Sequence, residues 1–155
     1  MLLHHVTLIV NDLQAAATFY HRELGLEIID VPGLDYPAAF FRINELQELH
    51  LAEFPDVPAS YRGHFCLRID DFNAAFHRFR ELGILDVGPW GKLRELPNGS
   101  LQLYVRDPAG NLVELTSRPE DRATIDPAIF AAEEWGGMPY QSGRADGRRY
   151  GAKTS

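Results

Sequence analysis

An internal repeat constrains this chain more than any other feature of its sequence. The segment HVTLIVNDLQAAATFYHRELGL, which starts at His5, matches HFCLRIDDFNAAFHRFRELGI, which starts at His64. Both copies run from a histidine through an apolar stretch to an aspartate, a pair of alanines and a closing Glu-Leu-Gly. Chance rarely produces so many identities over about 20 positions, so the chain contains a duplicated structural unit.

Each unit predicts a strand, a helix and then three short strands. The apolar run after the first histidine alternates as a strand does. Asp12 and Asp71 are candidate N-caps, and Gly25 and Gly83 suit the left-handed position after a helix. The remaining strands are expected at 26–30, 38–43 and 46–53 in the first unit, and at 85–87, 101–106 and 112–116 in the second. The expected fold is α+β, with two βαβββ modules.

The predicted domain covers residues 1–117, with module one at 2–54 and module two at 61–117. Residues 118–155 are rich in Gly, Pro and charge and contain one short helical stretch at 127–134. Two interpretations of this segment stay open, a loose C-terminal tail or a dimer arm that packs on a partner subunit. The arm interpretation accounts for four apolar side chains that would otherwise be exposed: Ile129, Phe130, Trp135 and Tyr140.

The overall composition narrows the class of partner. The chain carries 15 basic and 22 acidic residues, a net charge of −7, which argues against non-specific binding to nucleic acid. No apolar run is long enough for a membrane-spanning helix, and the N-terminal residues lack the pattern of a signal peptide. The single cysteine, Cys66, fits a reducing cytoplasm. These features favour a cytoplasmic domain that handles a small molecule or a protein.

Strand alternation separates core side chains from polar ones. Leucines, isoleucines and valines fall on one face of each strand, and the opposite face carries titratable groups. Buried polar groups cost several kcal/mol when they lack partners, so this polar face is expected to line a cavity. The side chains assigned to it include His5, Glu48, His50, His64, Cys66, Arg68, Gln102, Tyr104, Arg106 and Glu114.

Four of these residues occupy equivalent places in the repeat. His5 corresponds to His64, and His50 corresponds to Glu114. If an approximate two-fold axis relates the units, the four side chains converge between them. Three imidazoles and a carboxylate are suitable ligands for a divalent first-row metal. Glu48 lies on the same face as His50 and is an alternative to it as a ligand.

The remaining polar side chains have more ordinary expected roles, and only Arg68 has two. Arg68 either meets an anionic group of the substrate or pairs with Glu48. Cys66 is expected to act as a small buried apolar residue, because no nucleophile–base pair is evident in the sequence. Three further histidines are expected at the surface: His4, His21 and His77.

Several motifs give the chain a resemblance to a known family. They are H-x-x-L-x-V-x-D-L near the start, L-H-L-x-E in the middle, G-H-F-x-L-x-I-D-D, and Y-V-R-D-P-A-G-N-L-V-E-L. Together they resemble the vicinal oxygen chelate superfamily over about residues 2–117. That superfamily includes glyoxalase I, fosfomycin-resistance proteins, extradiol dioxygenases, methylmalonyl-CoA epimerase and bleomycin-resistance proteins.

The resemblance implies paired βαβββ modules that form a cup around one divalent metal, commonly within a homodimer. The family's ligands fall on His5, His64 and Glu114. The fourth falls on His50, where glyoxalase-like members often carry Glu or Gln. Tyr104 matches a tyrosine that touches the substrate in dioxygenase-like and fosfomycin-resistance members. The metal could be Fe, Mn, Ni, Co or Zn.

Two functions from different classes follow. The first is a metal-dependent enzyme acting on a small oxygen-rich substrate, by isomerase or lyase chemistry or as a ring-cleaving dioxygenase. Glu48, or Glu114 once detached from the metal, is the candidate base, while Tyr104 and Arg68 orient the substrate. The second is a metal-free, drug-sequestering protein of the bleomycin-resistance type. The bleomycin-resistance branch generally lacks the metal ligands. The metal content of the protein after purification distinguishes the two functions.

Overall fold

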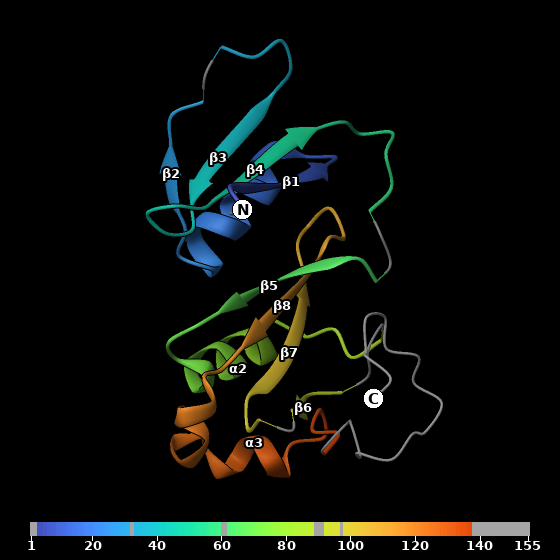
Figure 1. Cartoon of the computed structure of the whole chain (residues 1–155). Coiled ribbons are helices and arrows are strands. Elements are labelled where there is room, and N and C mark those ends of the chain that lie inside the picture. Colours follow the sequence, from blue (N-terminus) through green and yellow to red (C-terminus); the bar gives the residue numbers. More distant parts are fainter. Residues whose placement is uncertain (1–2, 32, 60–61, 89–91, 97, 138–155) are drawn as a thin grey trace, which may run out of the picture.

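The computed structural model of the chain describes residues 3–31, 33–59, 62–88, 92–96 and 98–137. Two four-stranded sheets account for the strands (Figure 1). In module one the order is β1-β4-β3-β2, with strands β1 (His5–Val10), β2 (Glu27–Ile29), β3 (Ala38–Arg42) and β4 (Glu48–Glu53). In module two it is β5-β8-β7-β6, with β5 (His64–Arg68), β6 (Arg94–Glu95), β7 (Leu101–Arg106) and β8 (Leu112–Thr116).

The two sheets have the same topology. In each, the first and last strands of the module run parallel and the other neighbours are antiparallel. A helix separates the first strand from the second in both modules. The helical segments are α1 (Leu13–Thr18), η1 (Phe19–Glu23), α2 (Phe72–Glu81), η2 (Pro119–Thr124) and α3 (Pro127–Ala131). The predicted α+β class and the duplicated βαβββ unit are confirmed.

The helix ends follow from the residues at their boundaries. The Asp12 carboxylate accepts a hydrogen bond of 2.9 Å from the backbone N–H of Ala15, and Asp71 accepts the equivalent bond from Ala74. Each satisfies one of the free donors in the first turn of its helix. After the helices, Gly25 and Gly83 adopt φ angles of +70° and +67°, where a side chain would be strained. Among the described residues, no helix has the length and apolar character needed to cross a bilayer.

The prediction for the second strand of module two was wrong in its position. Leu85 makes only an isolated bridge to Val105, and the strand that pairs with β7 is β6. The reason lies in Asp86, whose carboxylate accepts hydrogen bonds from the backbone N–H of Gly88 and from Arg106. These bonds stabilise a bend that takes the chain away from the sheet before a longer strand can form.

The core lies where the helices cover the apolar faces of the sheets. The core-facing residues expected on β4, β7 and β8 are fully buried, namely Leu49, Leu51, Leu103, Val105, Val113 and Leu115. Aromatic side chains of the helical segments pack on them, with Tyr20 from module one and Phe76 from module two both fully buried. Because one cluster of buried side chains draws on both modules, the modules share a single core.

The turn between β7 and β8 ties the modules together and reaches toward module one in Figure 1. Within it, Asp107 is buried and accepts a hydrogen bond of 2.9 Å from the hydroxyl of Tyr20. Asn111 in the same turn donates a 2.9 Å hydrogen bond to the backbone carbonyl of Ile9. Burial and the neighbouring Asp107 raise the pKa of Tyr20 well above its usual value, so its hydroxyl remains a donor.

The segment after Ser117 packs on module two of its own chain as far as Gly137. Ile125 and Ile129 are buried, and the Phe130 and Trp135 rings meet edge to face with centroids 4.9 Å apart. The expected helix is shorter than predicted and ends at Ala131. Tyr140, the fourth apolar residue assigned to this segment, lies outside the described residues.

Asp126 joins this segment to α2 and gives a pH-dependent contribution to stability. Its carboxylate accepts from the backbone N–H of Ala128 and lies 2.8 Å from the His77 ring, and these contacts lower its pKa. A lowered pKa stabilises the fold above the ordinary value of 3.8, and that stability is lost as pH falls through the lowered pKa. We expect Asp126→Ala to lower Tm at pH 7, and its difference from wild type to be smaller near pH 3.

Thermal unfolding followed by circular dichroism measures this difference at both pH values. Asp56→Ala is a suitable control, because Asp56 is an exposed turn residue and its removal should leave Tm unchanged at either pH. A constant difference between wild type and Asp126→Ala across this range would contradict the assigned role.

Candidate metal and substrate site

Glu114 organises the polar face of module two. It lies on β8, an inner strand of its sheet, and is 6% exposed. Its Oε2 lies 3.0 Å from Nε2 of His64 and accepts a 2.8 Å hydrogen bond from the Tyr104 hydroxyl. Its Oε1 accepts a 2.5 Å bond from Gln102. Three side chains therefore hold both oxygens of one buried carboxylate in a fixed orientation.

The corresponding face of module one carries a stack of three rings. The His50 ring lies parallel to Phe40 on one side, at 3.6 Å between centroids, and stacks on His5 on the other, at 4.3 Å. Nε2 of His50 lies 2.8 Å from Oε2 of Glu48. This hydrogen bond to His50 is the main reason why the pKa of Glu48 is lowered, so Glu48 is a carboxylate at neutral pH.

These contacts define two half-sites. Half-site one consists of His5, Glu48 and His50, and half-site two of His64, Tyr104 and Glu114. Within the described ranges, no group of three or more His, Cys, Asp or Glu side chains lies close enough together to hold a metal ion. The structure therefore brings the four predicted ligands together as two pairs, His5 with His50 and His64 with Glu114.

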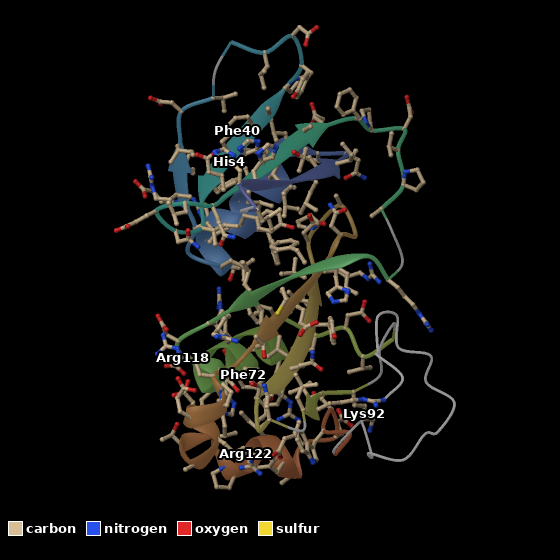
Figure 2. All side chains as sticks on the ribbon, viewed as in Figure 1. His4, Phe40, Phe72, Lys92, Arg118 and Arg122 are labelled. Atoms are coloured by element: carbon tan, nitrogen blue, oxygen red, sulfur yellow. The ribbon has the colours of Figure 1, made fainter. Side chains whose placement is uncertain are left out.

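A cavity of about 630 Å³ lies between the modules. His5 and Glu48 line it from module one, and Cys66 and Arg68 line it from module two. Arg68 is exposed, and in the described part of the chain it forms no ion pair with Glu48. Of the two readings of Arg68, pairing with Glu48 is therefore not observed. Figure 2 shows His4 and Phe40 among the side chains of module one, and Phe72 among those of module two.

Cys66 differs from its expected environment. The residue is exposed rather than buried, and on the sheet it pairs with Glu114. Desolvation of the thiol, with a smaller effect of the Glu114 charge, raises the pKa of Cys66 to about 12. The side chain is therefore a neutral thiol at physiological pH, which makes it a poor nucleophile.

Half-site two fits a divalent metal by its donor chemistry and spacing. Imidazole nitrogen and carboxylate oxygen are common ligands of first-row metals. Two ligands about 2.1 Å from an ion in adjacent octahedral positions are about 3.0 Å apart. The 3.0 Å between Nε2 of His64 and Oε2 of Glu114 matches that spacing, although both atoms now hydrogen-bond to each other. Two more ligands must come from elsewhere to complete the site.

The sequence analysis missed the roles of two side chains at the site and assigned no structural role to one turn. Phe40 was not assigned to the site, but its place directly opposite His50 in the β3–β4 register follows from strand alternation. Gln102 was placed on the polar face without a role, and it holds Glu114. The D-P-A-G-N turn carries much of the family resemblance, yet Asp107 and Asn111 fasten the modules together rather than line the half-sites.

The comparisons with known proteins agree with this fold. The family model of the Glyoxalase/Bleomycin resistance protein/Dioxygenase superfamily matches residues 2–115. The chain belongs to this superfamily.

Among solved structures, a lactoylglutathione lyase from Agrobacterium tumefaciens is 31% identical, with a TM-score of 0.59, and the match covers 77% of this chain and 95% of that one. The oxidase ChaP-H2 is 26% identical with a TM-score of 0.61, covering 77% and 94%. A glyoxalase/dioxygenase from Nostoc punctiforme, at 24% identity and a TM-score of 0.62, covers 76% and 91% and supports the fold alone. No curated protein is significantly similar to the chain.

Proposed function

We propose that the protein is a metal-dependent enzyme acting on a small oxygen-rich substrate. The observation that carries this proposal is half-site two, where a histidine and a buried carboxylate are spaced as adjacent metal ligands beside a tyrosine hydroxyl. His5, His50, His64 and Glu114 would hold the ion. A divalent ion of Fe, Mn, Ni, Co or Zn would supply Lewis acidity toward two neighbouring substrate oxygens.

The protein's own side chains would do the remaining work. The Tyr104 hydroxyl lies beside the ligand carboxylate, where it can donate a hydrogen bond to a substrate oxygen. Glu48 is ionised and borders the cavity, so it can accept a proton from a bound substrate. Arg68 borders the same cavity and can orient a negatively charged substrate. An available carboxylate base favours proton transfer, and the similarity to a lactoylglutathione lyase points to the same lyase or isomerase chemistry.

The site is proposed to form between two copies of the chain. In one chain the modules are fixed by the shared core, by the Tyr20 bond to Asp107 and by the Asn111 bond to Ile9. Moving one module relative to the other within a chain would disturb these contacts. A second copy can instead place its half-site two against half-site one of the first copy and leave these contacts in place. Two-fold symmetry then produces two equal sites. The proposed setting is a homodimer in the cytoplasm, which fits the single free cysteine.

Mixing two inactive variants tests this arrangement. His5→Ala/His50→Ala removes half-site one and His64→Ala/Glu114→Ala removes half-site two, so each variant alone should purify without metal. If the sites are shared, a heterodimer of the two variants contains one intact site and one site with no ligands. We therefore expect the heterodimer to regain about half of the wild-type metal per chain.

Co-expression with two affinity tags isolates the heterodimer, and elemental analysis measures its metal content. A metal-free heterodimer, with metal retained in wild type, would show that one chain forms each site. A wild-type protein that holds no metal but binds a bulky cationic drug tightly would instead support the sequestering function.

A further inference from the structure

A row of four side chains crosses the polar face of module two. The strand registers place Arg68 opposite Thr116, Thr116 opposite Gln102 and Gln102 opposite Arg94. Residues directly opposite each other in a sheet point to the same side. The row therefore has an arginine at each end. The neighbouring row on the same face of the sheet contains Glu114 and Tyr104.

Arg94 points into this face, and the described part of the chain gives its Nε no hydrogen-bond partner. Its neighbour Glu95 alternates to the other side of the sheet, where it pairs with Arg122 of η2 at 3.0 Å. Arg94 itself is half-buried, and its Nε is fully shielded from water with no hydrogen-bond partner. In the ranges that the structure describes, its guanidinium group also forms no ion pair. A buried donor of this kind destabilises the folded protein unless a ligand supplies an acceptor.

Six of the ten arginines that the structure describes pair with a carboxylate. Six described pairs are Arg42–Glu27, Arg78–Glu23, Arg80–Glu134, Arg106–Asp86, Arg118–Asp70 and Arg122–Glu95. The 22 acidic residues outnumber the 15 basic ones, so a shortage of partners does not explain Arg94 and Arg68. A buried polar group left unsatisfied in a folded protein calls for an explanation such as an absent ion or ligand.

We infer that Arg94 and Arg68 together bind an anionic group of the substrate, a carboxylate or a phosphate-type oxyanion. Three strand spacings put their Cα atoms roughly 14 Å apart, so two arginine side chains that lean inward can reach one anion above Thr116 and Gln102. A guanidinium group binds such oxyanions with two parallel hydrogen bonds. This inference rests on the proposed function, because the proposed function makes the polar face of module two part of the substrate site. It narrows the substrate class to small oxygen-rich anions.

Inorganic phosphate is the probe for this site. Phosphate is titrated into metal-free protein, prepared with a chelator, and its binding is followed by calorimetry. We expect Arg94→Met and Arg68→Met each to weaken phosphate binding at least about tenfold. Arg94→Lys keeps the charge but loses the two-pronged geometry, so its affinity should be intermediate.

Arg22→Met is the matched control, because Arg22 is exposed on η1 and its replacement removes the same charge. Its phosphate affinity should stay within about twofold of wild type. Equal affinity in wild type and the Arg94 variants, an equal loss in Arg22→Met, or no phosphate binding by wild type would overturn the inference. Arg94→Lys keeps the test valid if Arg94→Met fails to fold.

The metal content of the same variants separates this inference from the proposed function. Arg94→Met should retain as much metal as wild type when purified without chelator, because Arg94 is not a proposed ligand. If wild type retains no metal, the proposed function fails. The phosphate titration in metal-free protein then still decides whether Arg94 binds an anion.

Discussion

Glu114→Ala is expected to retain less than about a tenth of the metal that wild type retains after purification without chelator. The carboxylate is the only acidic member of the proposed ligand set, and its charge offsets that of the cation. It is also held in place by His64, Tyr104 and Gln102, so no other side chain in half-site two can take its position. Elemental analysis of the purified protein measures the loss.

Glu114→Gln separates a lost ligand from a damaged fold. Alanine leaves three donors around Glu114 without an acceptor, which destabilises a site that is 6% exposed. Glutamine preserves the size of the side chain and one acceptor oxygen but removes the negative charge. We expect Glu114→Gln to remain folded, as judged by circular dichroism, and still to lose most of the metal. Full metal retention in either variant would rule out the carboxylate as a ligand.

His77→Ala is the control for this experiment. His77 and Asp126 form the same kind of histidine–carboxylate pair, at 2.8 Å, but outside the two half-sites. Removing the imidazole should lower Tm slightly through the lost contact with Asp126 and leave the metal content unchanged. Metal loss in His77→Ala would mean that any damaged histidine–carboxylate pair weakens retention, and would undermine the assignment of half-site two.

Local patterns were sufficient to predict most of the fold. Strand alternation identified β7 and β8 with their observed bounds, because each has a continuous core-facing set such as Leu103 with Val105. The caps at Asp12 and Asp71 and the glycines after the helices depend only on neighbouring backbone groups. The repeat then extended the prediction from one module to the other.

Contacts between distant segments could not be predicted from local sequence patterns. β6 consists of Arg94 and Glu95, which have no apolar alternation, and its position depends on a bend at Asp86. The four ligand candidates were correctly placed on polar faces, but their division into two half-sites depends on how the modules pack. No periodicity in the chain encodes that packing, because it depends on side-chain bonds such as Tyr20 to Asp107.

Loss of the Asp107 side chain should have a large effect on stability, because Asp107 serves both the contact between modules and its own turn. Asp107→Ala removes the acceptor used by the Tyr20 hydroxyl and by both the backbone N–H and the side-chain amide of Asn111. Asp107 is 4% exposed, so water replaces it poorly. We expect a loss of about 3–5 kcal/mol in the free energy of unfolding, or roughly 10 °C in Tm.

Tyr20→Phe isolates the contact between modules from the turn itself. It removes one hydroxyl, leaves the Asn111 bonds to Asp107 intact, and should cost about 1–2 kcal/mol. In the double variant the two costs should not add, since the Tyr20 contact is already lost in Asp107→Ala. Denaturant unfolding of the four proteins measures this coupling. Strict additivity would mean that Asp107 stabilises only its own turn and that its bond to Tyr20 does not hold the two modules together.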